Sequence, residues 1–513
     1  MKINYSFSKK DTDYIKALGL TKREVEKQLA VYYRGPSYLK LIRPCKPGDG
    51  ILAVTPAQRR KLIRQFETDA GSHRMMKFVP ASGAASRMFA HWFSAAQEGT
   101  FGDESADRDF FHHLKKMPFV SLLEQNPTVR HHLQKKNIAA VLDYILSEQG
   151  LHYGWLPKAL IPFHAYPEGE IRTALEEHII EAASYIRDQK GVCRLHVTLS
   201  EEHIKKVKAK LREVKRKYDN QLQVRVKMDH SVQSSATNII AVNKDMTPFR
   251  SGEGCLVFRP GGHGALLTNL AALDADYVFV KNIDNIVPQN LLEKILPYKK
   301  MMGGLALQMQ RMTFAILREM ENSRGSSEKM DAYADFCRQM FHKVFPEDFP
   351  HESLAQKKKK LFSVLNRPLR VCGMVRNEGE PGGGPFWVDE ADAAPSLQIV
   401  ESAHVDPDNP GQQAVWRDSE FFNPVDMICC IRDYRGEKFD LQKYVNRDAY
   451  LISAKTEKGR NLLAQELPGL WNGSMAGWNT IFVELPLAVF NPVKTVDDLL
   501  RPQHTAGKRI HKR

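Results

Sequence analysis

The chain has 513 residues, 42% of them hydrophobic, so it is long enough to bury a large core. It contains no run of about 18 apolar residues, which excludes a membrane-spanning helix, and its start, MKINYSFSKK, lacks the apolar core of a signal peptide. Seven scattered cysteines without a CxxC pair indicate neither a disulfide framework nor a zinc site. We therefore expect a soluble protein of the cytoplasm.

The net charge of +14 is compatible with nucleic-acid binding or with a site for small polyanions. The basic residues are concentrated in residues 203–218, 357–360 and 508–513. In the first of these, apolar residues recur at helical spacing, so the basic side chains are expected on the solvent face of an amphipathic helix. No RNA-recognition motif, zinc finger or interleaved aromatic pattern is present, and nucleic acid is not an expected partner.

The N-terminal region, residues 1–72, is predicted to be a polar helical extension. Its clearest element begins at Thr55-Pro56, where threonine is a good N-cap and proline fits the first helical turn. The region carries no recognisable chemistry.

A short apolar strand, residues 75–80, runs into a segment of small residues that ends in Arg87. Small side chains expose backbone N–H groups, a helix N-terminus favours anions, and arginine adds a fork of donors. The arrangement is typical of a phosphate cradle, although tight packing of helix on strand would select the same small residues. The segment has neither the Walker pattern nor GxGxxG.

Further along, Lys158 lies between prolines and apolar residues in LPKALIPF, which disfavours a free surface position. A helix over 172–185 and strands over 192–199, 221–228 and 237–242 follow. Helices are predicted over 91–150 and over 300–365, where we interpret the methionines as core packing.

Residues 258–287 contain the most informative pattern of the chain. A glycine-rich turn, Pro260–Gly264, allows close approach of backbone to a ligand. A helix with leucines on one face follows, and then an apolar strand at Tyr277–Val280 that ends in Lys281–Asn285. Ligands of open α/β sheets lie beyond the carboxyl ends of strands, so Asp284 is a candidate ligand of a hydrated metal ion. It could equally cap the next helix.

The order of the motifs resembles eukaryotic-type UDP-glucose pyrophosphorylase. GHG followed by YVFVKNIDN is similar to the GHG and YIFVxNIDN segments of that family, and FNPVKTVDDLL to its FLPVKTTSDLL. IVESAHV resembles the family's LLEIAQV segment, and FFNP resembles its IFNTNN segment. Upstream, PASGAASRMF resembles the LxGGxGTxxG loop and LPKALIPF resembles the PK segment that follows it. VQSS is similar to the base-contacting NQS. The resemblance covers roughly residues 75–502. The chain resembles the UDP-N-acetylhexosamine pyrophosphorylases less closely, and it looks like a member of a bacterial family with this fold.

The resemblance implies an α/β fold of the GT-A-like nucleotide-diphospho-sugar transferase type, with a Rossmann-like mixed sheet. The implied divisions are a helical extension (1–72), an α/β domain (73–502) with helical insertions at about 91–150 and 300–365 and a sugar-side lobe at about 366–502, and a basic tail (503–513).

The resemblance also implies roles for individual residues. The base and ribose would be held by Ala81, Ser82, Gly83, Gln233, Gly262, His263 and Gly264. The triphosphate would be held by Arg87 and Lys158, the reacting phosphates by Lys494, and Mg²⁺ by Asp284. The sugar would be held by Gly383, Glu401 and Asn423.

The chemistry so implied joins a nucleoside triphosphate, UTP first, to a sugar-1-phosphate. That reaction needs no covalent intermediate or strong base, because the sugar phosphate is already an oxyanion, so positioning and charge neutralisation suffice. The phosphate loop departs from the family at Ser82 and Ala85, where the family places glycines, and at Ser86. The gap between Arg87 and Lys158 is longer than the family's. Because the sequence ends soon after Leu500, we expect no counterpart of the family's C-terminal β-helix.

Two alternatives to this enzyme remain. The altered glycine loop favours a non-catalytic protein that binds a nucleotide or a nucleotide sugar, and charge alone favours a nucleic-acid-associated protein. The pattern does not specify the base, the sugar, the oligomeric state or the role of the helical insertions.

Overall fold

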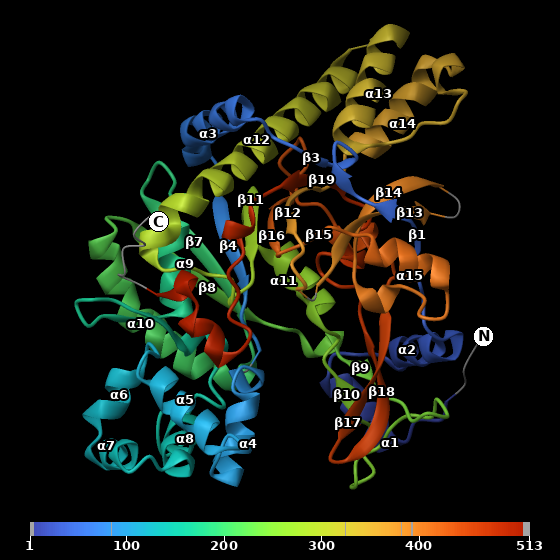
Figure 1. The fold of residues 1–513 in the computed structure, drawn as a ribbon. Helices are drawn as coiled ribbons and strands as arrows, with labels where there is room; N and C mark the ends of the chain where they lie inside the picture. Colours follow the sequence, from blue (N-terminus) through green and yellow to red (C-terminus); the bar gives the residue numbers. More distant parts are fainter. Residues whose placement is uncertain (1–4, 84, 324, 381, 391–392, 506–513) are drawn as a thin grey trace. The chain divides into compact units, whose positions relative to one another are not determined.

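The computed structural model describes residues 5–83, 85–323, 325–380, 382–390 and 393–505. These residues form two compact units (Figure 1). Unit 1 comprises the chain up to residue 62 together with 233–278 and 302–486, and unit 2 comprises 63–232, 279–301 and the chain from 487 onward. Ala84, Pro381 and residues 506–513 of the predicted basic tail lie outside the described residues. Among the helices described, none combines the length and the apolar character needed to cross a membrane.

In the sheet of unit 2, β4–β7 and β7–β8 are parallel pairs. The strand order is β11-β4-β7-β8, with β4 at Met75–Pro80, β7 at Val192–Leu199, β8 at Arg225–Val232 and β11 at Tyr277–Lys281. Every residue of β11 is buried, as its apolar run predicts. A small antiparallel pair is formed by β5 (Pro162–Ala165) and β6 (Ile171–Thr173).

The helices of unit 2 fall into two groups. The first fills the predicted insertion and consists of α4 (Ala90–Glu98), α5 (Glu104–Leu114), α6 (Val120–Gln125), α7 (Pro127–Gln134) and α8 (Ile138–Leu146) (Figure 1). The second consists of α9 (Ala174–Ala183) and α10 (Ile204–Gln221). On α10 the apolar residues Val207, Leu211 and Val214 are buried, which confirms the predicted amphipathic helix.

Unit 1 contains a mixed, mostly parallel sheet in the order β2-β3-β19-β12-β16, in which only the β12–β16 pair among these described strands is antiparallel. Its strands are β2 (Lys46–Pro47), β3 (Gly50–Leu52), β12 (Leu369–Arg376), β16 (Asp426–Cys430) and β19 (Asn479–Glu484), with β15 (Phe421–Phe422) beside β12. An antiparallel sheet combines β1 (Lys40–Pro44), β13 (Gly384–Glu390) and β14 (Ala393–Val400). Two further pairs are β9 (Ile239–Ile240) with β10 (Phe258–Arg259), and β17 (Leu451–Glu457) with β18 (Arg460–Glu466).

The helices of unit 1 include α1 (Lys9–Ala17), α2 (Lys22–Arg34), α11 (Leu267–Ala272), α13 (Ser327–Phe341), α14 (Leu354–Leu365) and α15 (Pro410–Arg417). Two longer helices, α3 (Pro56–Asp69) and α12 (Leu292–Asn322), contribute residues to both units. At the start of α3 the hydroxyl of Thr55 accepts the N–H of Gln58 at 3.3 Å, which confirms the predicted cap.

The structure corrects three predictions of secondary structure. Residues 40–52 belong to the region predicted as helical but form β1, β2 and β3, and β1 pairs with the distant strand β13, which no local pattern reveals. The strand predicted to start at residue 221 begins at Arg225, because α10 continues to Gln221. The strand predicted over 237–242 is reduced to β9, because residues 241 and 242 hydrogen-bond with several other segments.

Candidate functional site

The segment after β4 is anchored to two neighbouring parts of unit 2. The N–H of Ala81 donates to the carbonyl oxygen of Thr198 at 3.1 Å, and the N–H of the buried Ala85 donates to that of Leu156 at 2.9 Å. Gly83 is exposed, and a methyl group added there would meet open space. Arg87, at the end of the short 3₁₀ helix η2 (Ala85–Arg87), is exposed and available to an anion. The Leu156 contact also joins this loop to the segment that carries Lys158.

Lys158 and Asp284 form the centre of a charged cluster in unit 2. Nζ of Lys158 lies 3.5 Å from Oδ2 of Asp284, and the two side chains are 16% and 26% exposed. The same ammonium donates to the carbonyl oxygen of Val493 at 2.9 Å, and the N–H of Val493 donates to the carbonyl oxygen of Asp284 at 3.0 Å. The prediction that Lys158 is not a free surface charge is therefore confirmed.

The backbone around Lys494 is joined to the segment of Asp284 and to the segment of Arg87. The N–H of Asn491 donates to Oδ1 of Asn285 at 2.9 Å, and the N–H of Val496 donates to the carbonyl oxygen of Met88 at 3.0 Å. The half-buried Lys494 has its own N–H held by Asp498 Oδ2 at 2.7 Å. These bonds gather Arg87, Lys158, Asp284 and Lys494, which are far apart in the sequence, into one neighbourhood, which we call the Asp284 cluster.

In the Asp284 cluster the carboxylate of Asp284 is paired with Lys158, and the segments that carry Arg87 and Lys494 are bonded to its neighbours. Among the described residues, no three His, Cys, Asp or Glu side chains are gathered as metal ligands. Mg²⁺ is commonly held by one or two carboxylates together with waters and substrate phosphates. The half-buried carboxylate of Asp284 beside basic side chains suits that mode, and it does not suit a site made of protein ligands alone.

In unit 1 the glycine-rich turn is a tightly packed structure. Gly262 has φ 72°, a conformation that favours glycine. A Cβ on Gly264 would lie 2.1 Å from the carbonyl oxygen of Pro468, and one on Gly261 would lie 2.5 Å from that of Thr237. The second contact brings the turn against the segment of Gln233, whose Nε2 donates to Oγ1 of Thr237 at 3.3 Å.

His263 is oriented by two contacts. Its ring stacks on Trp471 with centroids 4.1 Å apart, and its Nδ1 accepts the N–H of Leu470 at 3.0 Å. Because Nδ1 is an acceptor, neutral His263 carries its proton on Nε2. That atom lies 3.7 Å from Oε1 of Glu401.

Glu401 is an ionised acceptor in a partly buried position. Burial alone would raise the pKa of Glu401, but the nearby imidazole of His263 and the hydrogen bond of Asn472 lower that pKa to about 2. Nδ2 of Asn472 donates to Oε1 of Glu401 at 2.7 Å. The carboxylate is therefore charged at neutral pH and can accept a hydrogen bond from a hydroxyl group.

Gly383 and Asn423 adjoin Glu401. The N–H of Asn423 donates to the carbonyl oxygen of Gly383 at 2.7 Å, and a Cβ on Gly383 would lie 3.3 Å from Cγ of Glu401. Nδ2 of Asn423 is buried and has no hydrogen-bond partner among the described residues. Val425, two residues on, has φ 56°, which is strained for a β-branched residue and typical of functional sites.

Unit 1 thus gathers a second group of predicted residues, which we call the His263 cluster: Gln233, Gly262, His263, Gly264, Gly383, Glu401 and Asn423. Ala81, Ser82 and Gly83, predicted with this group for the base and ribose, belong to unit 2. Sequence reasoning missed Trp471 and Asn472. Their signal was an aromatic residue beside the turn-forming pair Asn472-Gly473.

Comparisons with known proteins give one family and several similar structures. A model of the family described as "Domain of unknown function (DUF4301)" matches residues 8–505. Among curated proteins, none matches the chain. One similar structure is a mutant of UDP-glucose pyrophosphorylase from Leishmania major in complex with UDP-glucose, at 13% identity over 96% of this chain and 79% of that chain with a TM-score of 0.45. Another similar structure is UDP-N-acetylglucosamine pyrophosphorylase from Trypanosoma brucei in complex with inhibitor, at 11% identity over 96% and 82% of the two chains with a TM-score of 0.47.

Proposed function

The chain belongs to the DUF4301 family, and we propose that it is a nucleotidyltransferase that joins a nucleoside triphosphate to a sugar-1-phosphate. UTP is the first candidate, because the motif order resembles UDP-sugar pyrophosphorylases. The products are a nucleotide sugar and pyrophosphate. We propose as well that the fold is of the GT-A-like class.

In this proposal the Asp284 cluster serves the phosphates. An oxygen of the sugar-1-phosphate attacks the α-phosphorus in line, a new P–O bond forms, and the bond to the pyrophosphate group breaks with its electrons leaving on pyrophosphate. Arg87, Lys158 and Lys494 neutralise the charge that moves onto the leaving oxygens. No general base is required, because the attacking oxygen is already anionic.

Asp284 is proposed to hold Mg²⁺ together with phosphate oxygens and water. Bound there, the ion would supply charge neutralisation and orientation of the phosphates. The contact with Lys158 keeps the Asp284 carboxylate in one place before substrates arrive.

The His263 cluster is proposed to bind the organic parts of the substrates. Gln233 and the turn at Gly262 and Gly264 would contact the base and ribose. The carboxylate of Glu401 would accept a hydrogen bond from a sugar hydroxyl. Nδ2 of Asn423, which has no hydrogen-bond partner among the described residues, would donate to another.

One observation carries the proposal. Backbone hydrogen bonds join the segments of Arg87, Lys158, Asp284 and Lys494 in one unit, although their chain positions are far apart. A protein that only binds a nucleotide has no need to bring three cationic segments together with the segment of Asp284.

The test is a matrix of pyrophosphate-release assays. Purified protein with Mg²⁺ is given each of four nucleoside triphosphates with each of a panel of sugar-1-phosphates. Release that requires one triphosphate and one sugar phosphate together supports the proposal and identifies both substrates. Absence of release across the panel, from a protein that still binds UDP-sugars in calorimetry, would support a binding protein instead.

One contact favours that second candidate, a non-catalytic protein that binds a nucleotide or a nucleotide sugar. The N–H of Ala85, which a phosphate cradle would aim at its ligand, donates to the carbonyl oxygen of Leu156. The loop therefore offers a triphosphate fewer backbone donors than a glycine-rich loop would. Arg87 and Lys158 have to supply more of the phosphate contacts.

A further inference from the structure

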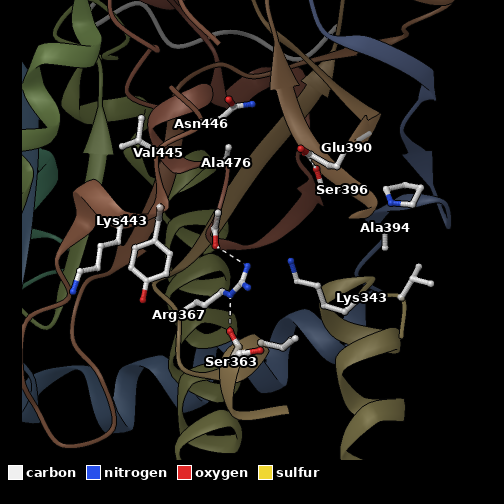
Figure 2. A pocket seen from close by; sticks show the side chains of 15 residues that line it. Lys343, Ser363, Arg367, Glu390, Ala394, Ser396, Lys443, Val445, Asn446 and Ala476 are labelled. Atoms are coloured by element: carbon white, nitrogen blue, oxygen red, sulfur yellow. Dashed lines mark hydrogen bonds between the residues drawn. The ribbon is translucent and has the colours of Figure 1, made fainter. Parts of the chain in front are cut away.

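Unit 1 contains a cavity of about 580 Å³ that includes none of the predicted site residues (Figure 2). The cavity is lined by residues from four places: just after α13, the end of α14 and the turn beyond it, the β13–β14 hairpin, and segments 443–446 and 476–477. Part of the lining therefore comes from the second helical insertion, for which the sequence predicts no role.

Two basic side chains, Lys343 and Arg367, point into the cavity and toward each other (Figure 2). The guanidinium of Arg367 is held in place, because Nε donates to the carbonyl oxygen of Ser363 at 2.7 Å and Nη1 donates to that of Gly477 at 3.4 Å. These two bonds leave its Nη2 and one hydrogen of Nη1 for another acceptor. Within the described part of the chain, the ammonium of Lys343 has no hydrogen-bond or ion-pair partner.

The local charge is unbalanced in favour of the cations. Burial, followed by the positive charge of Arg367, lowers the pKa of Lys343 to about 8. The fully buried Arg370 adds to the effect, and its own hydrogen bonds go to a hydroxyl and a carbonyl oxygen. The carboxylate of this cavity belongs to Glu390, which accepts a hydrogen bond from the hydroxyl of Ser396.

Two like charges held together in a partly buried cavity destabilise the fold unless an anion lies between them. A rigid arginine fork beside a lysine point charge is a combination suited to a phosphate group. Hydroxyl and amide groups of Ser396, Tyr444 and Asn446 complete a polar lining.

We propose that this cavity, which we call the Lys343–Arg367 pocket, binds a phosphate group of a small phosphorylated molecule. The Arg367 guanidinium and the Lys343 ammonium donate to the phosphate oxygens, and the ligand's remaining atoms occupy the rest of the cavity. The proposal does not depend on the reaction proposed above.

The pocket is separate from the His263 cluster. On the β13–β14 hairpin, Gly384 pairs with Val400 beside Gly383 and Glu401, whereas Glu390 pairs with Ala393 at the opposite end. Six residues of strand separate these two ends, a distance of roughly 20 Å at the usual rise per residue. The site that binds a phosphate in the pocket is therefore distinct from any ligand site at Glu401.

Calorimetric titration of the full chain with inorganic phosphate and with pyrophosphate tests the proposal. Lys343→Met removes one charge and keeps the apolar stem, and Lys359→Met is the matched control on the exposed face of α14. We expect binding by the unchanged chain and by the control, at least tenfold weaker binding by Lys343→Met and by Arg367→Gln, and weaker binding of malonate than of phosphate. Because Arg367→Gln could disturb the end of α14, the result for Lys343→Met is decisive.

Phosphate could also bind the Asp284 cluster, so the titration is repeated with Lys158→Met. Binding that survives Lys158→Met and is lost with Lys343→Met supports the pocket. Binding that is lost with Lys158→Met and kept with Lys343→Met overturns it, as does the absence of phosphate and pyrophosphate binding. Equal binding of malonate overturns the assignment to phosphate.

Thermal unfolding gives a second readout. Without an added anion, Lys343→Met should melt no lower than the unchanged chain, because the substitution removes repulsion between like charges. The rise in Tm that phosphate causes should disappear in this variant. A large fall in Tm without anion, with the phosphate-dependent rise retained, would contradict the pocket.

Discussion

The Nζ atom of Lys158 lies 3.5 Å from Oδ2 of Asp284 and donates to the carbonyl oxygen of Val493 at 2.9 Å. Both side chains are partly buried, so solvent screens their interaction less than it screens a surface pair. The contact fixes an ammonium and a carboxylate side by side. A phosphate oxygen approaching Lys158 would therefore meet a cation whose position is already set, and Asp284 would face the cation that accompanies the phosphate.

Replacing Lys158 tests the role of this ammonium. Lys158→Met should lower kcat for pyrophosphate release by about 10²- to 10³-fold, the loss typical of one preorganised charged donor. Lys190→Met, which removes an exposed charge from the same unit, is the control and should leave kcat unchanged. Equal rates for the two variants would remove Lys158 from the phosphate site.

The close packing of the glycine turn predicts a specific steric effect. Gly264→Ala places Cβ about 2 Å from the carbonyl oxygen of Pro468, so backbone must move. We expect the free energy of unfolding to fall by at least about 2 kcal/mol in urea titrations. Gly252→Ala, where a Cβ meets open space, should change it by less than about 0.5 kcal/mol. Similar values for the two variants would show that the turn is not tightly packed.

The lowered pKa of Glu401 predicts how stability depends on pH. Its pKa is about 2 in the folded protein, against an ordinary 4.5, so the unfolded chain takes up the proton first. The contribution of Glu401 is therefore fully present above pH 4.5 and is lost as the pH falls from 4.5 toward 2. The gap in unfolding free energy between the unchanged chain and Glu401→Gln should be roughly 3 kcal/mol at pH 7 and less than half of that at pH 3. A gap that does not change with pH would contradict the ionised state assigned to Glu401.

A buried ion network supports the strand that leads to Asp284. Nζ of Lys77 lies 3.0 Å from Oε1 of Glu181, and Nζ of Lys281 lies 2.7 Å from Oε2, with all three side chains at most 2% exposed. Glu181→Gln takes away the carboxylate that both lysines contact and should destabilise the protein by about 3–5 kcal/mol. Urea titration measures this, with the exposed Glu213→Gln as control. A loss below about 1 kcal/mol would contradict the pairing.

Much of the sheet could be predicted from local sequence. The run Tyr277–Val280 is apolar on both faces, as a doubly covered strand requires, and the structure has β11 there. The same reasoning put Asp284 just beyond that strand. Lys281 follows the same run but is buried against Glu181, so its position in the polar segment gave no sign of its partner.

The remaining features depend on contacts between distant segments. Strand β1 forms because Lys40–Pro44 pairs with β13, and its own residues suggest no strand. The stacking of Trp471 on His263 joins two separate segments of unit 1 that are far apart in the sequence, and no periodicity reveals it. Lys343 likewise looks like an ordinary residue after a helix until the fold brings Arg367 opposite it.

The central claim is that the Asp284 cluster performs nucleotidyl transfer, and the most direct measurement compares pyrophosphate release by the unchanged chain, Asp284→Asn and the exposed control Glu293→Gln with Mg²⁺. We predict release that needs both a nucleoside triphosphate and a sugar-1-phosphate, at least a 100-fold loss with Asp284→Asn, and no loss with the control. Release by Asp284→Asn at the rate of the unchanged chain, or no release by any of the three proteins with any pair of substrates, would contradict the account.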